Sequence, residues 1–556
     1  MRKLLGLLLA LTMLLGCCTA TAEAVLPAKD IVVLFTSDAH CGVNTGFGYV
    51  GVAAIRDQMA AAGNYVTLVD NGDAIQGEPI GTITTGSAII GLMNATGYEI
   101  AIPGNHEFDY GMDRFLELTT TANFPYISCN FNKDGVLVFA PYVIKDYDGV
   151  QVAFVGVTTP KTITSSTPRY FQNEAGEFVY GFDQDVSGEK LYKAVQTAVD
   201  AARTEGADYV FVMGHMGNEA SGSPWTYADV IGNTAGIDAF LDGHSHDTDQ
   251  VIMKNRDGKD VLRSACGTKL EGVGYLRISA KDGAMTSGLY TWHNDVSAPD
   301  LLGVSNSVSE AVESATAALS EQLSEVVASS SVDLTINDPA AVDESGKPIR
   351  IVRRAETNLG DLCADAYRAM SGADIAFVNG GGIRVTIGAG DITLNDILKV
   401  HPFGNSMCAV EATGQEILDA LEWGARVTPE ETGAFLQVSG LTYEIHTYVE
   451  STCTEDENGL FTGVSGEYRV KNVRVGNEEL DLTKTYILAS HNYMIKNAGD
   501  GFTMFQDNNL LQDEVMLDNQ VLINYITGTL GGVVGTQYAE PYGEGRIVAV
   551  PEKTSE

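Results

Sequence analysis

The residues best suited to chemistry in this sequence are five histidines in short Gly-, Asp- and Asn-rich stretches of its first half. The 556-residue chain has nine histidines, and the five are His40, His106, His215, His244 and His246. Imidazoles combined with carboxylates are ligands for zinc, manganese, cobalt and iron. Bound ions of this kind activate water and polarise phosphoryl oxygens. These stretches therefore indicate metal-assisted hydrolysis.

The spacing within these motifs favours metal binding. Alternate residues of an extended segment point the same way, so Asp38 and His40 can converge, as can His244 and His246. Asp73 follows a glycine and can present both carboxylate oxygens to two ions. Each motif alone is more typical of a turn, a cap or a satisfied core residue, but five in order predict a metal centre. In order they are Asp38-x-His40, Gly72-Asp73, Gly104-Asn105-His106-Glu107-Phe108-Asp109, Gly214-His215 and Gly243-His244-Ser245-His246.

Buried strands are expected to position these residues. Four apolar runs, at 31–35, 65–69, 209–213 and 237–241, each lead directly into a motif. Such runs alternate with helical stretches from about residue 30 to residue 295, which predicts an α/β domain. Ligands of α/β domains gather at the carboxyl ends of the strands.

The five motifs resemble the signature blocks of the calcineurin-like metallophosphoesterases. The resemblance implies a four-layer α/β sandwich with two divalent ions about 3.5–4 Å apart, holding a hydroxide that attacks phosphorus in line. One ion would take Asp38, His40, Asp73 and His246. The other would take Asp73, Asn105, His215 and His244. Relatives often carry Gln or Asn in place of His246, and zinc, manganese, cobalt and iron all remain open.

The same resemblance gives His106 a catalytic role beside the ions. His106, paired with Asp109, would not bind metal. It would supply a proton or positive charge to the departing oxygen, which leaves as an alkoxide.

A second set of motifs lies in the C-terminal half. Apolar residues at spacings of three and four predict a helix over 304–328, ended by the serines at 329–331. A second α/β or α+β domain is expected from 332 to 550. Within it, Asn379-Gly380-Gly381-Gly382-Ile383-Arg384 follows an apolar run. A glycine loop lets a phosphate approach the backbone, and a guanidinium beside it adds charged hydrogen bonds.

These C-terminal motifs resemble the C-terminal domain of 5'-nucleotidases, so the resemblance covers nearly the whole mature chain. It implies that Phe403 and Tyr493 stack on the base and that Asp500 binds the ribose hydroxyls. Relatives usually have Phe six residues before the Asp, so Met494 is the alternative to Tyr493 in that register. The implied substrate-binding set is Arg353, Asn379, Gly381, Arg384, Phe403, Asn405, Tyr493 and Asp500, with Asn379 and Asn405 near the base edge and Arg353 and Arg384 on the phosphate side.

Composition excludes several classes of protein. With 44% hydrophobic and 19% charged residues the chain is globular. Its net charge of −39 repels nucleic acid polymers and anionic membranes, so a phosphate site needs its own local positive charge. Six cysteines beyond residue 22 are scattered without CxxC spacing, which argues against a thiolate zinc cluster.

The N-terminus reads as an export signal over residues 1–22. Arg2 and Lys3 precede an apolar run at 4–15 that is shorter than the roughly 20 residues of a membrane span. Cleavage after Ala20-Thr21-Ala22 would release a soluble protein. Leu14-Leu15-Gly16-Cys17 instead resembles a lipoprotein box that would leave Cys17 lipidated. We slightly prefer release, since Leu fits the second position of that box weakly.

The predicted organisation is thus a signal peptide at 1–22, a catalytic domain at 23–303, a linker helix at 304–331 and a substrate-binding domain at 332–550. The expected function is extracytoplasmic hydrolysis of nucleoside 5'-monophosphates to nucleoside and phosphate. One alternative is 2',3'-cyclic-nucleotide phosphodiesterase/3'-nucleotidase or UDP-sugar hydrolase activity. Another, of a different class, is a non-catalytic nucleotide-binding surface protein.

Overall fold

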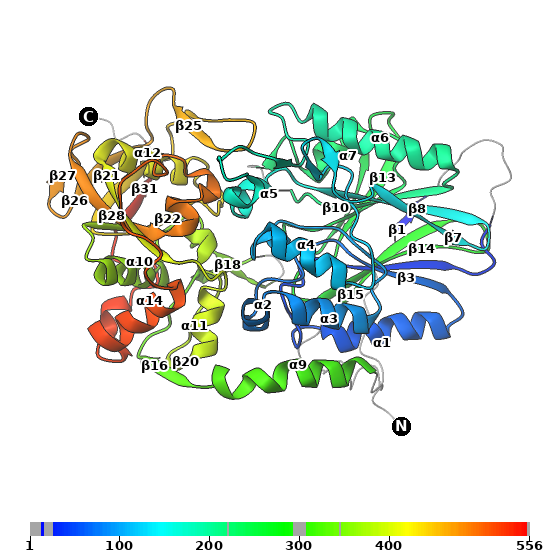
Figure 1. Ribbon diagram of the computed structural model, residues 1–556, viewed down its shortest axis with the longest axis horizontal. Coiled ribbons are helices and arrows are strands. Elements are labelled where there is room, and N and C mark those ends of the chain that lie inside the picture. Colours follow the sequence, from blue (N-terminus) through cyan, green and yellow to red (C-terminus); the bar gives the residue numbers. More distant parts are fainter. Residues whose placement is uncertain (1–12, 16–25, 219–221, 293–306, 344–345, 553–556) are drawn as a thin grey trace. The chain divides into compact units, whose positions relative to one another are not determined.

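The computed structural model describes residues 13–15, 26–218, 222–292, 307–343 and 346–552 (Figure 1). Contacts divide the chain into two compact units, one of residues 1–163 and 170–318 and the other of residues 164–169 and 319–556. Both expected cleavage sites lie outside the described residues. In the described part of the chain, no helix has the length and apolar character needed to cross a membrane.

Two six-stranded sheets form the N-terminal unit. The first has the order β1-β15-β14-β2-β3-β4 and the second β12-β13-β11-β10-β8-β7. The first sheet consists of β1 (Met13–Leu15), β15 (Met285–Thr291), β14 (Gly272–Ile278), β2 (Ile31–Thr36), β3 (Tyr65–Asp70) and β4 (Ile100–Ala101). The second consists of β12 (Gln250–Lys254), β13 (Asp260–Ala265), β11 (Ala239–Asp242), β10 (Tyr209–His215), β8 (Val150–Thr158) and β7 (Tyr142–Tyr147).

Alternation of side chains along the strands explains how these sheets pack. Phe154 of β8 and Phe211 of β10 belong to a core shared with the first sheet. Their neighbours Val155 and Val212 face the opposite way, onto helix α6 (Glu189–Glu205). Helix α1 (Gly48–Ala61) packs against β3 of the first sheet. Helices therefore cover both outer faces of two stacked sheets (Figure 1), and the expected four-layer α/β arrangement is confirmed.

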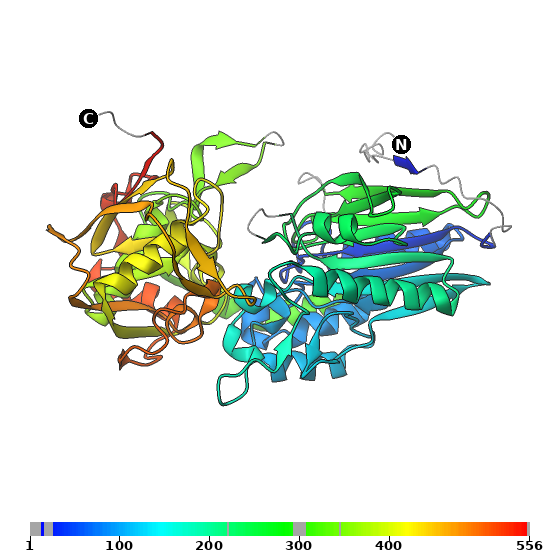
Figure 2. The same cartoon turned by 90° about the horizontal axis from the view of Figure 1, so that it is seen from above.

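Parallel pairing brings the motif loops to one edge of each sheet. β2 pairs in parallel with β3, and β10 pairs in parallel with β11. The four predicted strands are all present, and the motifs follow their C-terminal ends. Figure 2 shows α6 running along the strands that it covers. Further elements of this unit are α2 (Pro79–Thr84), α3 (Ser87–Thr96), α4 (Met112–Thr121), α7 (Tyr227–Asn233), β5 (Asn132–Lys133), β6 (Val136–Leu137) and β9 (Tyr180–Gly181).

The connecting helix is shorter than the sequence predicts. Helix α9 (Ser307–Leu323) ends five residues before the expected end at 328. Residues 326–330 instead form strand β16 (Val326–Ser330), which pairs with β20 (Gly390–Thr393) and β30 (Val533–Val534). The adjacent valines Val326 and Val327 are β-branched and favour a strand once a partner is available. The helical prediction was wrong for this stretch because it rested on the spacing of apolar residues, which does not reveal that the stretch pairs with β20 and β30.

A five-stranded sheet with helices on both faces forms the centre of the C-terminal unit, which confirms the second α/β domain. Its order is β22-β19-β28-β21-β29, from β22 (Leu436–Ser439), β19 (Ile375–Asn379), β28 (Thr485–His491), β21 (Met407–Thr413) and β29 (Leu510–Gln512). Helix α10 (Asn358–Ser371) packs on one face and α12 (Gly414–Ala425) on the other. Further elements are α11 (Leu394–Val400), α13 (Asn492–Ile495), α14 (Asp518–Asn524), β17 (Asn337–Val342), β18 (Pro348–Arg350), β23 (Leu441–His446), β26 (Val470–Val475), β27 (Glu478–Glu479) and β31 (Ile547–Val550).

Candidate functional site

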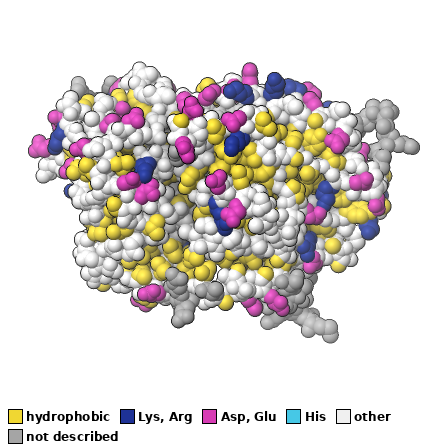
Figure 3. Space-filling model, viewed as in Figure 1, with side chains coloured by type: hydrophobic (Ala, Val, Ile, Leu, Met, Phe, Trp, Pro, Cys, Tyr) yellow, Lys and Arg dark blue, Asp and Glu magenta, His cyan; other side chains and the backbone are white. Residues whose placement is uncertain are grey.

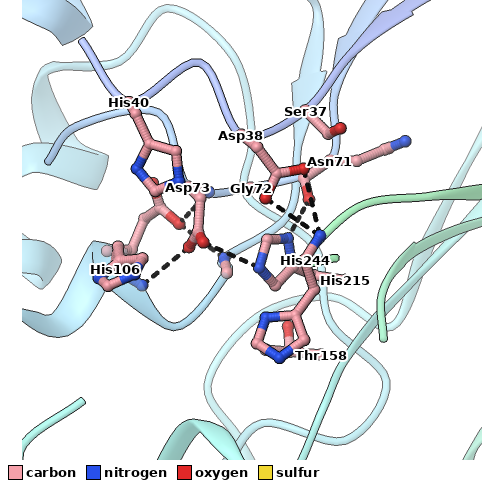
Figure 4. Close-up of polar contacts among 12 residues, drawn as sticks. Ser37, Asp38, His40, Asn71, Gly72, Asp73, His106, Thr158, His215 and His244 are labelled. Carbon is pink, nitrogen blue, oxygen red and sulfur yellow. Dashed lines mark hydrogen bonds and ion pairs between the residues drawn. The ribbon is translucent and has the colours of Figure 1, made fainter. Parts of the chain in front are cut away.

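The histidine motifs of the N-terminal unit meet at the C-terminal ends of β2, β3, β10 and β11. Figure 4 shows the carboxylate of Asp73 between His106 and His215. Three groups of side chains each have their ligand atoms within 4.8 Å of one another. These groups are Asp38 with His40 and His246, His40 with Asp73 and His106, and Asp73 with His215 and His244. Asp73 and His40 each belong to two of them, so the three groups form one continuous cluster, and the group that these two residues share also includes His106.

Distances between the donor atoms are those of groups that surround a common centre. His215 Nε2 lies 3.1 Å from Asp73 Oδ2, and His40 Nε2 lies 3.1 Å from His246 Nε2. Asp38 Oδ1 lies 3.6 Å from the same His246 nitrogen. The structure thus brings together carboxylate and imidazole donors from separate loops.

The backbone of these loops is held in an uncommon conformation. Positive φ values occur at Asp38 (51°), His40 (43°), Asp73 (60°), His244 (84°) and His246 (58°). Such conformations cost about 1–3 kcal/mol each outside glycine and persist where surrounding contacts impose them, often at functional sites. Their coincidence with the predicted ligands is independent support for the site.

The donor set fits divalent ions. The far ring nitrogens are fixed by backbone carbonyls, since His40 Nδ1 lies 3.0 Å from the Gln76 oxygen and His215 Nδ1 lies 2.7 Å from the Asn71 oxygen. Each contact leaves Nε2 directed toward the other donors, as is usual for metal-binding histidines. Asn105 Oδ1 is buried and accepts no hydrogen bond from the part of the chain that the structure describes. A bound cation would satisfy that oxygen.

The carboxylates and imidazoles of this cluster shift one another's pKa values. Burial raises the pKa of Asp38 to about 7, opposed by the nearby His215. Burial also acts against ionisation of Asp73, but His215 and His106 hold the pKa of that carboxyl well below its usual range. Conversely, Asp73 overcomes burial to raise the pKa of His215 to about 10. Buried carboxylate charge at this position is therefore matched by adjacent cations.

His106 is placed beside the ligand cluster with a defined orientation. Its Nδ1 lies 2.6 Å from Asp109 Oδ2, and its ring centroid is 5.2 Å from that of His40. Its backbone N–H donates to Asp73 Oδ1 at 2.8 Å. The contact with Asp109 fixes the ring through Nδ1. A proton available to the cluster would therefore be carried on Nε2.

Sequence reasoning quoted Glu107 within its motif but gave it no role. The buried carboxylate accepts hydrogen bonds from the backbone N–H groups of Asp73, Ala74 and Gly104, at 2.8, 2.8 and 2.6 Å. It thereby joins the loop after β3 to the loop after β4. In the sequence, Glu107 is marked only by its position directly after His106, and that position does not reveal which backbone groups its carboxylate contacts.

In the C-terminal unit, three of the predicted substrate residues form one hydrogen-bonded cluster. Asn379 Nδ2 donates to Asp500 Oδ2 at 2.6 Å, and the Asp500 backbone N–H donates to the Tyr493 hydroxyl at 3.0 Å. His491, which the sequence did not single out, lies with Nε2 3.0 Å from Asn379 Oδ1 and so fixes which way the amide points. Its place two residues before Tyr493 was the available signal.

The structure distinguishes the two candidates for the second stacking position. Met494 is completely buried in the core beneath α12, whereas Tyr493 is only half-buried. A side chain that stacks on a base must be accessible, so the geometry favours Tyr493. Phe403 is also half-buried, and the guanidinium of Arg384 lies 5.6 Å from its ring centroid.

The glycines of the motif at 379–384 are explained by packing of the backbone, without any phosphate. Gly380–Gly382 form a 3-10 turn, and a Cβ on Gly380 would lie 2.3 Å from the Val352 carbonyl oxygen. A Cβ on Gly381 would lie 3.0 Å from the Gly433 Cα. These glycines are therefore required by close approach of the protein's own backbone. The predicted loop is real, but its glycine content is not evidence for a phosphate.

The two remaining substrate residues, Arg353 and Asn405, lie nearby in the same unit. The Cα of Arg353 approaches Gly380, and its carbonyl oxygen accepts from the Thr432 N–H at 3.0 Å. The Asn405 carbonyl oxygen accepts from the Asp518 N–H at 2.8 Å. Their side-chain roles stay predictions.

The four-layer fold and the shared ligand cluster define a metallophosphoesterase. Residues 31–248 match the calcineurin-like phosphoesterase family and residues 327–507 match the 5'-nucleotidase C-terminal domain. The chain belongs to the 5'-nucleotidase family and is a hydrolase of nucleotide phosphoesters, as the sequence predicted. The family implies bound divalent metal ions.

Relatives align over almost the full length. A 5'-nucleotidase of Vibrio parahaemolyticus is 27% identical over 540 residues, 89% of each chain. The trifunctional nucleotide phosphoesterase protein YfkN of Bacillus subtilis is 26% identical over 94% of this chain and 35% of its own length. The crystal structure of a 5'-nucleotidase precursor from Thermus thermophilus superposes with a TM-score of 0.75 and 26% identity, covering 94% of this chain and 100% of that one.

Proposed function

We propose that this chain hydrolyses nucleoside 5'-monophosphates to nucleoside and phosphate outside the cytoplasm. The observation that carries the proposal is the continuous cluster of carboxylate and imidazole groups, in which Asp73 lies with His40 and His106 on one side and with His215 and His244 on the other. A carboxylate placed between two sets of donors is what a two-metal phosphatase requires. Its similarity to a 5'-nucleotidase supports the choice of substrate position.

The N-terminal unit would hold the ions and carry out the chemistry. Asp38, His40, Asp73 and His246 would hold one, and Asp73, Asn105, His215 and His244 the other. Bound zinc, manganese, cobalt or iron supplies a nucleophile derived from water near neutral pH and neutralises charge on the phosphoryl oxygens.

His106 would act on the leaving group. With Nδ1 held by Asp109, its Nε2 can donate a proton to the ribose oxygen as the ester bond breaks. Loss of that proton matters most for a poor leaving group. A ribose alkoxide needs it more than an aryl oxide does.

The C-terminal unit would recognise the nucleoside. Phe403 and Tyr493 would stack on the base, with Asn379 and Asn405 at its edge. Asp500 would accept hydrogen bonds from the ribose hydroxyls, while Arg353, Arg384 and the backbone at Gly381 would contact the phosphate side. The hydrogen bond from Asn379 to Asp500 supports this arrangement because it preorganises both groups.

A substrate panel on metal-reconstituted protein tests the assignment. We expect AMP to be hydrolysed faster than 3'-AMP, cyclic 2',3'-AMP and UDP-glucose, with the products of each substrate separated by chromatography. Strong activity on 3'-AMP with none on AMP would overturn the proposal in favour of the cyclic phosphodiesterase/3'-nucleotidase alternative. Preference for UDP-glucose would favour the UDP-sugar hydrolase. The similarity to a trifunctional nucleotide phosphoesterase is the reason to include these alternative substrates in the panel.

A non-catalytic nucleotide-binding protein is the alternative from another class. The close grouping of carboxylate and imidazole side chains argues against an eroded site. Nucleotide affinity without metal-dependent turnover would support that alternative.

Export belongs to the proposal as well. The face drawn in Figure 3 carries both acidic and basic side chains, and the net charge of −39 is in keeping with a protein that does not bind anionic membranes. Release after Ala22 predicts a soluble extracytoplasmic product, whereas lipidation at Cys17 predicts a membrane-anchored one. Fractionation with and without a Cys17→Ala substitution separates the two.

A further inference from the structure

One buried arginine of the N-terminal unit has no part in the mechanism above. Arg263 lies in β13 with its side chain fully buried, beside three carboxylates. Its Nε and Nη2 donate to Asp242 Oδ2 at 3.1 and 2.8 Å, Nη2 also donates to Asp247 Oδ2 at 3.0 Å, and Nη1 donates to Asp249. The ring of Tyr227 covers the guanidinium at 4.2 Å. Desolvation of this kind is costly unless every donor is used.

The three carboxylates enclose a loop that carries two predicted metal ligands. Asp242 is the last residue of β11, and Asp247 and Asp249 lie just before β12. His244 and His246 lie between them. β13 pairs with both β11 and β12, so the Arg263 side chain starts directly beneath the loop and reaches both of its ends.

Further hydrogen bonds connect this guanidinium to a third ligand. The other oxygen of Asp242, Oδ1, accepts from the backbone N–H of Met216 at 3.0 Å, directly after His215. Asp247 Oδ2 also accepts from Ser245 Oγ at 2.7 Å, and Ser245 is the residue between the two loop histidines. One cation therefore connects carboxylates on both sides of His244 and His246 and, through Asp242, the backbone directly after His215.

The loop needs such restraint. Both His244 and His246 have positive φ, a conformation that non-glycine residues keep only when their surroundings impose it. Asp38 restrains the loop by accepting a hydrogen bond from the His244 N–H at 3.1 Å. The Arg263 network restrains it through Asp242 and Asp247.

We propose that Arg263 is a positioning residue that sets the geometry, and so the affinity, of the metal centre through the His244–His246 loop. The inference rests on the proposed function only in that the cluster binds metal ions. The simpler alternative is that Arg263 only neutralises the charge of the buried Asp242 and does not position the loop. The two differ in what a lysine would do, because an ammonium keeps the charge but lacks the planar fork that reaches three carboxylates.

The test compares purified Arg263→Lys with the wild-type protein and a matched control, Arg277→Lys. Arg277 lies in the neighbouring sheet in an exposed ion pair with Asp30. Binding of Mn²⁺ to the metal-free proteins is measured by calorimetry, and the Co²⁺-substituted proteins are compared by visible absorption. Hydrolysis of p-nitrophenyl phosphate gives kcat and KM.

We expect Arg263→Lys to bind Mn²⁺ about 10–100-fold more weakly, as loss of an outer-shell partner typically causes. We also expect an altered Co²⁺ spectrum and a fall in kcat that exceeds any change in KM. The control should match the wild type in all three measurements. A folded Arg263→Lys with wild-type affinity and spectrum would overturn the proposal and leave charge neutralisation as the role.

Asp249→Asn keeps the proposal testable if Arg263→Lys does not fold. Asp249 is half-exposed, so its substitution removes one arm of the network without emptying the core. A weaker shift in the same direction supports the proposal, and unchanged Mn²⁺ affinity counts against it. Wild-type protein that binds none of Mn²⁺, Co²⁺, Zn²⁺ and Fe²⁺ would instead refute the proposed function, which is a distinct result.

Discussion

Replacing Glu107 by Gln tests whether the two ligand loops after β3 and β4 are held by a single carboxylate. Oε2 of Glu107 accepts from the backbone N–H groups of Asp73 and Gly104, and Oε1 accepts from that of Ala74. The side chain is 1% exposed, so water cannot replace a lost partner. Glutamine has the same shape but only one accepting oxygen.

The structure sets the size of the effect. In Glu107→Gln one oxygen can keep the two N–H groups of Asp73 and Gly104, while the amide NH₂ faces the Ala74 N–H. An unsatisfied buried donor costs about 1–3 kcal/mol, and weakening two charged hydrogen bonds to neutral ones adds about 1 kcal/mol. In the opposite direction, burial and then the charge of Asp73 raise the pKa of Glu107, so removing its charge relieves some strain. The net loss should be about 2 kcal/mol.

Urea unfolding followed by circular dichroism measures this loss, and phosphate release measures its consequence. We expect kcat to fall as well, because the backbone of Asp73 and the turn before Asn105 both shift. Glu117→Gln is the matched control, since Glu117 is exposed and only pairs with Arg114 on the surface of α4; it should change stability by less than about 1 kcal/mol. Wild-type stability and activity in Glu107→Gln would refute the view that this carboxylate joins the loops.

Three other substitutions probe separate parts of the molecule. Asp73→Ala should abolish metal-dependent hydrolysis, and substantial phosphate release by the purified variant would contradict the shared-ligand role. Phe403→Ala should weaken turnover of AMP by about 1–3 kcal/mol while sparing p-nitrophenyl phosphate, because only the nucleotide has a base to stack; equal losses on both would make Phe403 structural. Burial lowers the pKa of His401 to about 4, below the value of about 6.5 in the unfolded chain, so the unfolded state takes up the proton first and stability falls as pH drops from 6.5 to 4. Between pH 7 and 5 the wild type should therefore lose about 2 kcal/mol relative to His401→Asn in urea unfolding, and parallel pH profiles would argue against a buried neutral imidazole.

The parts of the site that sequence could predict are those that depend on short-range pattern. Apolar runs marked β2, β3, β10 and β11, and parallel pairing of neighbouring strands placed the following polar residues at one edge. The motif residues of the first half then met because strand ends determine where loops begin. For the same reason the second domain could be predicted from its apolar run before Asn379.

The parts that sequence could not predict depend on contacts between distant segments. Helix α9 ends at Leu323 because the strand that follows, β16, pairs with β20 and β30, and spacing along the chain does not reveal these partners. Tyr493 and Met494 differ by one position, and only their burial shows which one can meet a ligand. In the sequence, Arg263 is recognisable only as a charged residue within the apolar strand β13. Its carboxylate partners become apparent only when β11 and β12 are placed beside that strand.

Two buried ionic residues of opposite sign divide the work of holding the metal ligands. Glu107 collects backbone donors and fixes the segments of Asp73 and Asn105, whereas Arg263 collects carboxylates and fixes the loop of His244 and His246. Each acts on backbone or on neighbouring side chains rather than on the ligand atoms. The strain of the positive φ values in the ligand loops is thus borne largely by groups outside the cluster. A ligand set arranged in this way is positioned by the protein before any ion binds, which lowers the reorganisation that binding would otherwise require.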